Sequence, residues 1–249
     1  MKKNSWPAVW VFILSGCLAE FVVAVGWIPG YLVPRPSFVI SVLFNDFAEL
    51  WSAFRDTMLA SFGGFVVSTV LGLGSALLIQ RFPLVDRALY PYAVFFQTVP
   101  IIAIAPLLVI WIGFGLTTVI AASSIVCIFP IISNTLDGFR SVNRSLLDLF
   151  RLYSANERDI LFRLRLPSAV PAIFSGLRVS AGLAVIGAIV GEFVVGGGIG
   201  GLVDVARTQQ RVDKVFAAIL MGAGLGLMLV KIVDLGRYIF ARRGYHNRH

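Results

Sequence analysis

The sequence predicts an all-α polytopic membrane protein with six transmembrane helices and a cytoplasmic helix-turn-helix loop. The first observation is composition: 58% of the 249 residues are hydrophobic and only 14% are charged, whereas about a quarter of a soluble domain is charged. The second is a series of apolar stretches close to the roughly 20 residues that a spanning helix needs. The third is an uneven distribution of Lys and Arg between the connecting loops.

Six apolar stretches follow one another along the chain. The uncharged run from 88 to 136 is too long for one span, and the segment from Gly113 to Thr118 divides it into two helices joined by a tight turn. A cleaved signal peptide is the alternative for the first stretch because Lys2 and Lys3 precede it, but Glu20 interrupts the apolar run. The other four predicted spans cover about 6–29, 57–80, 171–195 and 215–230.

The distribution of basic residues predicts the orientation in the membrane. With a cytoplasmic N-terminus, the inside segments hold 16 of the 21 Lys and Arg residues. Cytoplasmic loops carry such an excess, so both termini are predicted to be cytoplasmic, and the net charge of +8 reflects topology rather than a nucleic-acid partner. The outside segments, 31–56 and 196–214, mix apolar and charged residues as helices on a membrane surface do. The five outside cations are Arg35, Arg55, Arg207, Arg211 and Lys214.

The largest cytoplasmic loop, 137–167, predicts two short helices. Ser154 and Glu157 have the spacing of a capping box, and Pro167 is expected to end the helix that follows at about Arg165. The preceding stretch, 145–153, is also compatible with a helix. This hairpin either rests on the lipid headgroups or presents a helix to a cytosolic partner.

Motifs in and around this loop resemble those of binding-protein-dependent ABC importer permeases, of the nitrate, sulfonate and taurine type. The resemblance covers about 54–243, and two stretches loosely resemble the riboflavin and pyrimidine-precursor branch. The family's EAA triplet falls on Asp148, Leu149 and Phe150, which keep only its acidic character, and its turn glycine falls on Ser154. The matching motifs lie at 100–107, 111–115, 134–138, 148–155, 166–167, 171, 176–178 and 187–193.

The resemblance implies an inner-membrane permease subunit that works in a larger assembly. Its partners would be a cytosolic ABC ATPase, which uses the ATP, a second permease subunit and an extracytoplasmic substrate-binding protein. The chain itself would bind no cofactor or metal and would not be an enzyme. The expected divisions are 1–55 for the first helix and external segment, 56–243 for the permease core and 244–249 for a basic tail. The expected ATPase-coupling residues are Asp148, Arg151, Ser154, Ala155, Glu157, Ile160, Leu161 and Pro167.

Polar groups in the spans are candidates for the translocation path or its gate, because ionisable groups in a membrane are costly. Glu192 is such a candidate; the alternatives are a helix-end carboxylate or an ion pair with Arg207 or Arg211. Glu20 is expected to make a hydrogen bond between helices. Three residues at the start of the third span are further candidates for the path: Gln97, Thr98 and Pro100. The alternative for them is helix packing around a kink.

Several rival functions lack the residues that they require. The chain has no G-x-x-x-x-G-K-[ST] motif, and the glycine-rich run 196–201 is better explained as a hinge before an external helix. His246 and His249 stand without partners for a metal site, and Cys17 and Cys127 are expected to be separate thiols. A self-sufficient secondary transporter or channel is the alternative function. The substrate stays open between a nitrate-, sulfonate- or taurine-like anion and a vitamin or heterocycle precursor.

Overall fold

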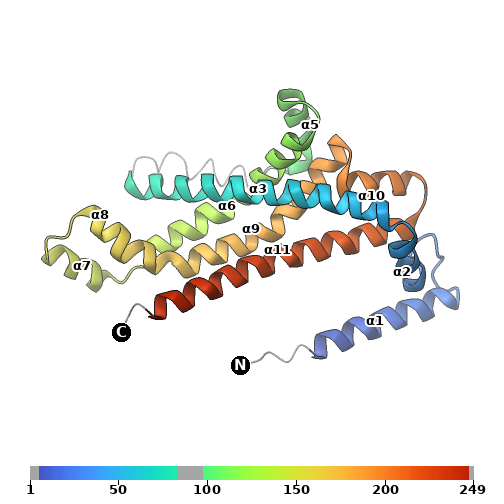
Figure 1. The fold of residues 1–249 in the computed structure, drawn as a ribbon, viewed down its shortest axis with the longest axis horizontal. Coiled ribbons are helices and arrows are strands. Elements are labelled where there is room, and N and C mark those ends of the chain that lie inside the picture. The colour runs from blue at the N-terminus through green and yellow to red at the C-terminus, as the bar shows by residue number, and fades with distance from the viewer. Residues whose placement is uncertain (1–5, 83–97, 247–249) are drawn as a thin grey trace.

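The structure, a computed structural model, describes residues 6–82 and 98–246, and every regular element in these ranges is a helix. Figure 1 shows an elongated bundle in which α3, α9 and α11 run along the long axis. The helices are α1 (Trp6–Ala24), α2 (Pro36–Asn45), α3 (Phe47–Arg81), α5 (Ile101–Ile112), α6 (Leu116–Arg140), α7 (Arg144–Leu152), α8 (Glu157–Asp159), a π-helix (Ile160–Arg165), α9 (Leu166–Val195), α10 (Gly198–Thr208) and α11 (Val212–His246).

The two ends of the bundle carry different short helices (Figure 1). We call the end with α7 and α8 the loop end and the end with α2 and α10 the cap end. Each of the two segments that are predicted to be outside contains a helix, α2 in the first and α10 in the second. α9 runs from the loop end to the cap end, and α11 returns beside it to the loop end (Figure 1).

Four of the six predicted spans are helices long and apolar enough to cross a membrane. They lie in Phe47–Arg81, Leu116–Arg140, Glu157–Val195 and Val212–Phe240. α1 and α5 have 19 and 12 residues, and the start of the third predicted span lies outside the described residues, so two spans stay predictions.

Two predicted boundaries need comment. The turn before α6 lies where it is predicted, because Gly113 and Gly115 adopt φ values of 98° and 129°, which favour glycine. The predicted division between 55 and 56 falls inside α3, which begins at Phe47. Residues 244–246 of the predicted tail also belong to a helix, α11.

Small residues bring α6 close to both α3 and α9. A Cβ atom at Gly187 would lie 2.8 Å from the Cα atom of Ser123, and one at Gly72 would lie 2.9 Å from a side-chain carbon of Ile131. Gly74, by contrast, faces open space. Close backbone approach at small residues is the usual means of packing helices in membranes, and Gly72 provides it between α3 and α6.

Hydrogen bonds across α6 and α9 satisfy polar groups that are shielded from water. The Cys127 thiol donates to the Ser180 carbonyl oxygen at 3.2 Å, and the Ser180 hydroxyl donates to the Cys127 carbonyl oxygen at 2.8 Å. The Ser123 hydroxyl donates to the Ala184 carbonyl oxygen at 2.9 Å. Cys127 therefore fills a structural position, while Cys17 is a separate, exposed thiol on α1. These bonds fix the register of the helix that extends from the loop end to the cap end.

Candidate functional site

The turn at the loop end is built around Ser154. This residue adopts φ 54°, in the left-handed region. Its N–H donates to the Arg151 carbonyl oxygen at 2.9 Å, and the Ala155 N–H donates to the Phe150 carbonyl oxygen at 3.0 Å. This pair of bonds is a Schellman motif, which ends α7.

The predicted capping box is wrong because Ser154 ends α7 and does not begin the next helix. The N-cap of α8 is Asn156, whose side-chain oxygen accepts a hydrogen bond from the Asp159 N–H at 2.8 Å. Asn is as good an N-cap as Ser. Asn156, two residues after the left-handed Ser154, has the extended conformation (φ −76°, ψ 163°) that is typical of an N-cap.

Pro167 does not end the loop helix, contrary to expectation. The helix runs without a break from Glu157 to Val195, and its turn at 160–165 is a π-helix in which the Leu166 N–H donates to the Leu161 carbonyl oxygen. A π-turn changes the register of the backbone hydrogen bonds of the helix. It therefore accommodates Pro167, which has a bulky ring and lacks an N–H group. The loop therefore passes into α9 as one continuous helix.

The predicted coupling residues divide into two groups by exposure. Ile160 is buried and Leu161 is half-buried against the bundle, where Leu161 packs beside a cluster that contains Ile79 and Phe139. These two side chains therefore pack the loop against the bundle. Ala155 is half-buried, and the exposed group comprises Asp148, Arg151, Ser154, Glu157 and Pro167.

An apolar tip that the sequence analysis missed lies beside Ser154. Leu152 and Tyr153 are 82% and 80% exposed, and Leu149 is 46% exposed one turn earlier on α7. The sequence could have indicated this tip, because Leu149 is three and four residues before Leu152 and Tyr153, and residues at these spacings share one face of a helix. Large apolar side chains at the end of an ordered turn are suited to insertion into a groove of a partner.

At the cap end, Glu192 binds the first turn of α10. One of its carboxylate oxygens accepts a hydrogen bond from the Gly200 N–H at 2.8 Å and one from the Thr57 hydroxyl at 2.9 Å. Its side chain is buried. Arg207 and Arg211 are paired with other acids, so the alternative of an ion pair between Glu192 and either arginine is wrong.

The glycine run that follows Glu192 is partly helix and not only a hinge. Gly196 and Gly197 form the turn out of α9, with φ 84° and 79°, and α10 begins at Gly198. A side chain at Gly198 would overlap the Glu192 carboxylate. The helix N-terminus favours a carboxylate because its first N–H groups have no partner within the helix.

Beside Glu192 lies a cavity of about 220 Å³ between α3, α6 and the Gly196–Gly198 turn, and Asp56 also lines it. Thr98 and Pro100 are exposed residues before α5. Neither is among the residues that line this cavity. Gln97 lies outside the described residues. Of the described path candidates, Glu192 lines this cavity and Thr98 and Pro100 do not.

Glu20 in α1 makes the expected bond between helices. Its two carboxylate oxygens accept hydrogen bonds from the backbone N–H and the hydroxyl of Ser37, at 3.0 and 2.8 Å. Ser37 lies in the first turn of α2. Both acids that the sequence places well inside spans therefore cap a helix at the cap end.

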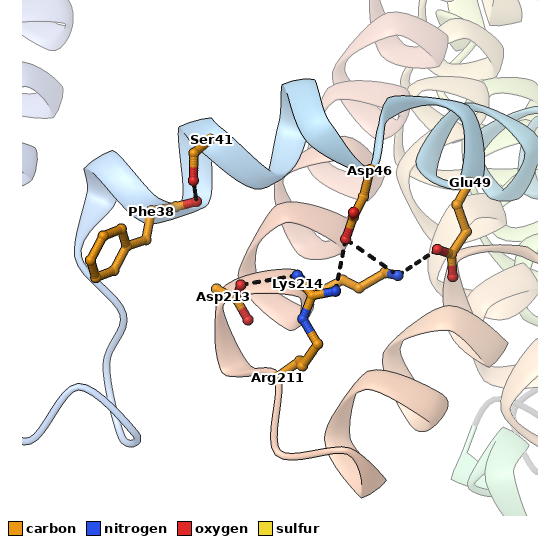
Figure 2. A network of polar contacts seen from close by, with 7 residues as sticks. All are labelled: Phe38, Ser41, Asp46, Glu49, Arg211, Asp213 and Lys214. Carbon is orange, nitrogen blue, oxygen red and sulfur yellow. Dashed lines mark hydrogen bonds and ion pairs between the residues drawn. The ribbon is translucent and has the colours of Figure 1, made fainter.

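A network of five charged residues joins α3 to the start of α11, as Figure 2 shows. Arg211 contacts Asp46 at 2.9 Å and Asp213 at 3.2 Å, and these contacts raise the pKa of the guanidinium, Asp213 contributing most. The buried Lys214 ammonium contacts Glu49 and, at 3.5 Å, Asp46. Asp46 is the residue between α2 and α3, so the network holds that junction against α11.

Replacing the buried cation should destabilise the cap end. We expect Lys214→Met to lower the free energy of unfolding by about 2 kcal/mol. Removing one partner of a fully buried ion pair costs about 3–5 kcal/mol, and the loss here should be smaller because Glu49 is half-exposed. The matched control is Arg207→Met, which breaks the exposed pair with Asp204 and should cost under about 1 kcal/mol. Thermal unfolding of both detergent-solubilised variants measures the difference, and equal effects would contradict a special role for Lys214.

Comparisons with known proteins agree with this architecture. Residues 68–244 match the family described as binding-protein-dependent transport system inner membrane component. A probable ABC transporter permease of Haemophilus influenzae is 36% identical, with 89% of this chain and 92% of that protein covered. The formylaminopyrimidine transport permease ThiX of Halalkalibacterium halodurans is also 36% identical, with 80% of each chain covered. The crystal structure of an amino acid ABC transporter with histidines has a chain that superposes with a TM-score of 0.64 at 14% identity, covering 81% of this chain and 96% of that one.

The fold and these matches define a transmembrane permease subunit of an ABC importer. The chain belongs to the family of binding-protein-dependent transport system inner membrane components, which confirms the resemblance in the sequence. It is an integral protein of the bacterial inner membrane and associates with an ATPase subunit. Permease subunits of this family are not enzymes, because ATP is hydrolysed on the separate subunit.

Proposed function

We propose that this subunit couples ATP hydrolysis on its partner to solute import through the turn between α7 and α8. The observation that carries the proposal is the apolar tip, Leu152 and Tyr153, held on an ordered Schellman turn. The acidic and basic side chains around it, Asp148 and Arg151, are exposed and complete an amphipathic docking surface. The ATPase would receive this tip in a groove.

The continuous helix behind the turn is suited to carry a displacement across the membrane. It has 39 residues from Glu157 to Val195, which is about 58 Å at 1.5 Å per residue. It is packed along α6 through close contacts at Gly187 and ends at the Glu192 contact with α10. Movement of the turn by the ATPase would therefore reach the cap end, where Glu192 would act as part of the gate.

The assembly follows from the two ends of the bundle. The loop end and both termini would be cytoplasmic, as the excess of Lys and Arg in the inside segments supports. The cap end would receive an extracytoplasmic binding protein that supplies the solute. A second copy of this chain would form the other half of the path, because Thr98 and Pro100 do not line the cavity beside Glu192. No cofactor is assigned to the chain itself.

A heterocyclic vitamin precursor is the solute class that we propose. The relative named for formylaminopyrimidine transport shares 36% of its residues over 80% of both chains. A small anion of the nitrate or sulfonate type is the alternative. Calorimetric titration of the partner binding protein with an aminopyrimidine and with a sulfonate distinguishes them, since tight binding of the sulfonate alone would exclude the heterocycle.

A substitution at the apolar tip tests the coupling proposal. We expect Leu152→Asp to reduce co-purification of the ATPase by about tenfold, because it places a charge in an apolar groove. Val205→Asp is the control: Val205 is 49% exposed, against 82% for Leu152, and it lies on α10 at the cap end. This variant should retain the ATPase. Normal capture by Leu152→Asp would contradict the proposed docking site.

Reconstituted uptake separates the importer from its rival. The complete assembly in proteoliposomes should accumulate solute only with ATP on the ATPase side, and the purified chain alone should accumulate none under a proton gradient. Uptake by the chain alone would instead support a self-sufficient secondary transporter.

A further inference from the structure

The hydroxyl of Thr57 lies where three helices meet. Thr57 belongs to α3 and is fully buried. Its oxygen accepts a hydrogen bond from the Ile199 N–H of α10 at 2.8 Å and lies 2.9 Å from the Glu192 carboxylate of α9, to which it donates. One side chain therefore connects the cap-end helix to two spans.

The first turn of α10 depends on these two side chains. Ile199 and Gly200 are its second and third helical residues, and such N–H groups have no carbonyl partner within the helix. Both residues are buried, so water does not replace the missing partners, and an unsatisfied buried N–H costs about 1–3 kcal/mol. Thr57 satisfies one N–H group and Glu192 satisfies the other.

The far end of α10 is also held against α3. Arg211, three residues beyond α10, pairs with Asp46 at the start of α3. Asp46 and Thr57 are 11 residues apart, or about 16 Å along a helix, which equals the length of the 11-residue α10. α10 therefore lies antiparallel to the outer part of α3 and is bound at both ends. Between these ends, Ile199 and Leu202 pack in one apolar cluster with Leu50 and Ala53.

We propose that Thr57 is a positioning residue for transport. It holds the first turn of α10 against Glu192 and thereby fixes the wall of the cavity that Glu192, Asp56 and the Gly196–Gly198 turn line. The inference rests on the proposed function, because the cavity matters only where solute passes. The role belongs to the hydroxyl and not to the volume of the side chain, since Val has the same shape but neither donates nor accepts.

Three substitutions separate the hydroxyl from the shape of the side chain. In the complete assembly we expect Thr57→Val to reduce the maximal rate of ATP-driven uptake by about tenfold, a magnitude typical of an unsatisfied buried group. Thr57→Ser keeps the hydroxyl and should transport within about twofold of the wild type. Ser61→Ala is the matched control, because Ser61 is equally buried one turn further along α3, but its hydroxyl bonds only within its own helix, to the Met58 carbonyl oxygen. It should transport normally.

The position of α10 is measured separately from uptake. With Cys17→Ser as background, Val205→Cys places a half-exposed thiol on α10. Its rate of labelling by a membrane-impermeant maleimide should change at least about threefold with Thr57→Val and remain unchanged with Thr57→Ser. ATPase co-purification should be equal in all variants.

Two results would overturn the inference: normal uptake by Thr57→Val, or equal loss in Thr57→Val and Thr57→Ser. If Thr57→Val does not reach the membrane, Thr57→Ala takes its place, because it also removes the hydroxyl. It is measured against Thr57→Ser with the same expectations. Failure of the proposed function is recognised differently, because the wild type and Ser61→Ala would then also lack ATP-driven uptake.

Discussion

Ser154→Pro should abolish capture of the ATPase while the protein still inserts into the membrane. Proline fixes φ near −65° and has no N–H, whereas Ser154 has φ 54° and donates to the Arg151 carbonyl oxygen. The substitution therefore destroys the turn that holds Leu152 and Tyr153. We expect less than about a tenth of the wild-type ATPase to co-purify, and quantitative blotting of the membrane fraction measures insertion.

The matched control is Ser154→Gly. Glycine adopts positive φ without the cost of about 1–2 kcal/mol that other residues bear, so this variant should retain the turn and bind the ATPase as well as the wild type. Capture of the ATPase by Ser154→Pro would show that the geometry of the turn is not required for docking.

Gly187→Leu should prevent stable packing of α9 on α6. A Cβ atom at this position would lie 2.8 Å from the backbone of Ser123, and backbone cannot move aside as a flexible side chain can. Overpacking typically costs about 1–3 kcal/mol, and the rigid backbone here places Gly187→Leu at the upper end, so we expect loss of folded protein. Thermal unfolding monitored by size-exclusion chromatography in detergent measures the loss.

Gly182→Leu on the same helix is the control for Gly187→Leu. A Cβ atom there has no neighbouring atom within 4 Å, and replacing Gly in a helix by Leu gains up to about 1 kcal/mol of helix propensity. This variant should unfold at or above the temperature of the wild type. Equal destabilisation by the two substitutions would contradict a specific contact at Gly187.

Much of the fold could be predicted because membrane helices follow simple physical rules. Length and apolarity located the four helices that are long and apolar enough to cross a membrane, and the glycines at 113 and 115 located the turn before α6. The mixed segments 31–56 and 196–214 indicated α2 and α10. Each of these features depends on local sequence alone, because in a bilayer the helix is the simplest way for a segment to satisfy its own backbone.

The details of the candidate site depend on contacts that local sequence does not encode. Ser154 and Glu157 have the spacing of a capping box, but the end of the preceding helix requires Ser154 for its left-handed residue, so Asn156 becomes the cap. Pro167 ends helices in general, but the π-turn before it admits the ring. From the sequence alone, Ile160 cannot be told from an exposed apolar residue of a short helix, because its burial depends on contacts with the rest of the bundle.

The contacts at the cap end were beyond prediction for the same reason. Thr57 and Ile199 are 142 residues apart, and nothing in the surroundings of Thr57 in the sequence distinguishes it from Ser61. Glu192 was recognised as unusual because it is an acid in a span, but its partner in α10 could be found only once α10 was placed. Polar positions of this kind are determined by the packing of three helices together.

The hydrogen bonds of the two acids within the spans bear on how the protein is energised. A carboxylate that relays protons must alternate between charged and neutral forms and exchange with water. Glu20 and Glu192 are instead engaged by main-chain amides at the starts of α2 and α10, so each protonation would weaken the hydrogen bond that anchors a helix, because a charged acceptor binds an N–H more strongly than a neutral one. The two carboxylates are therefore better suited to anchoring helices than to relaying protons, which agrees with our proposal that the ATPase supplies the energy for transport.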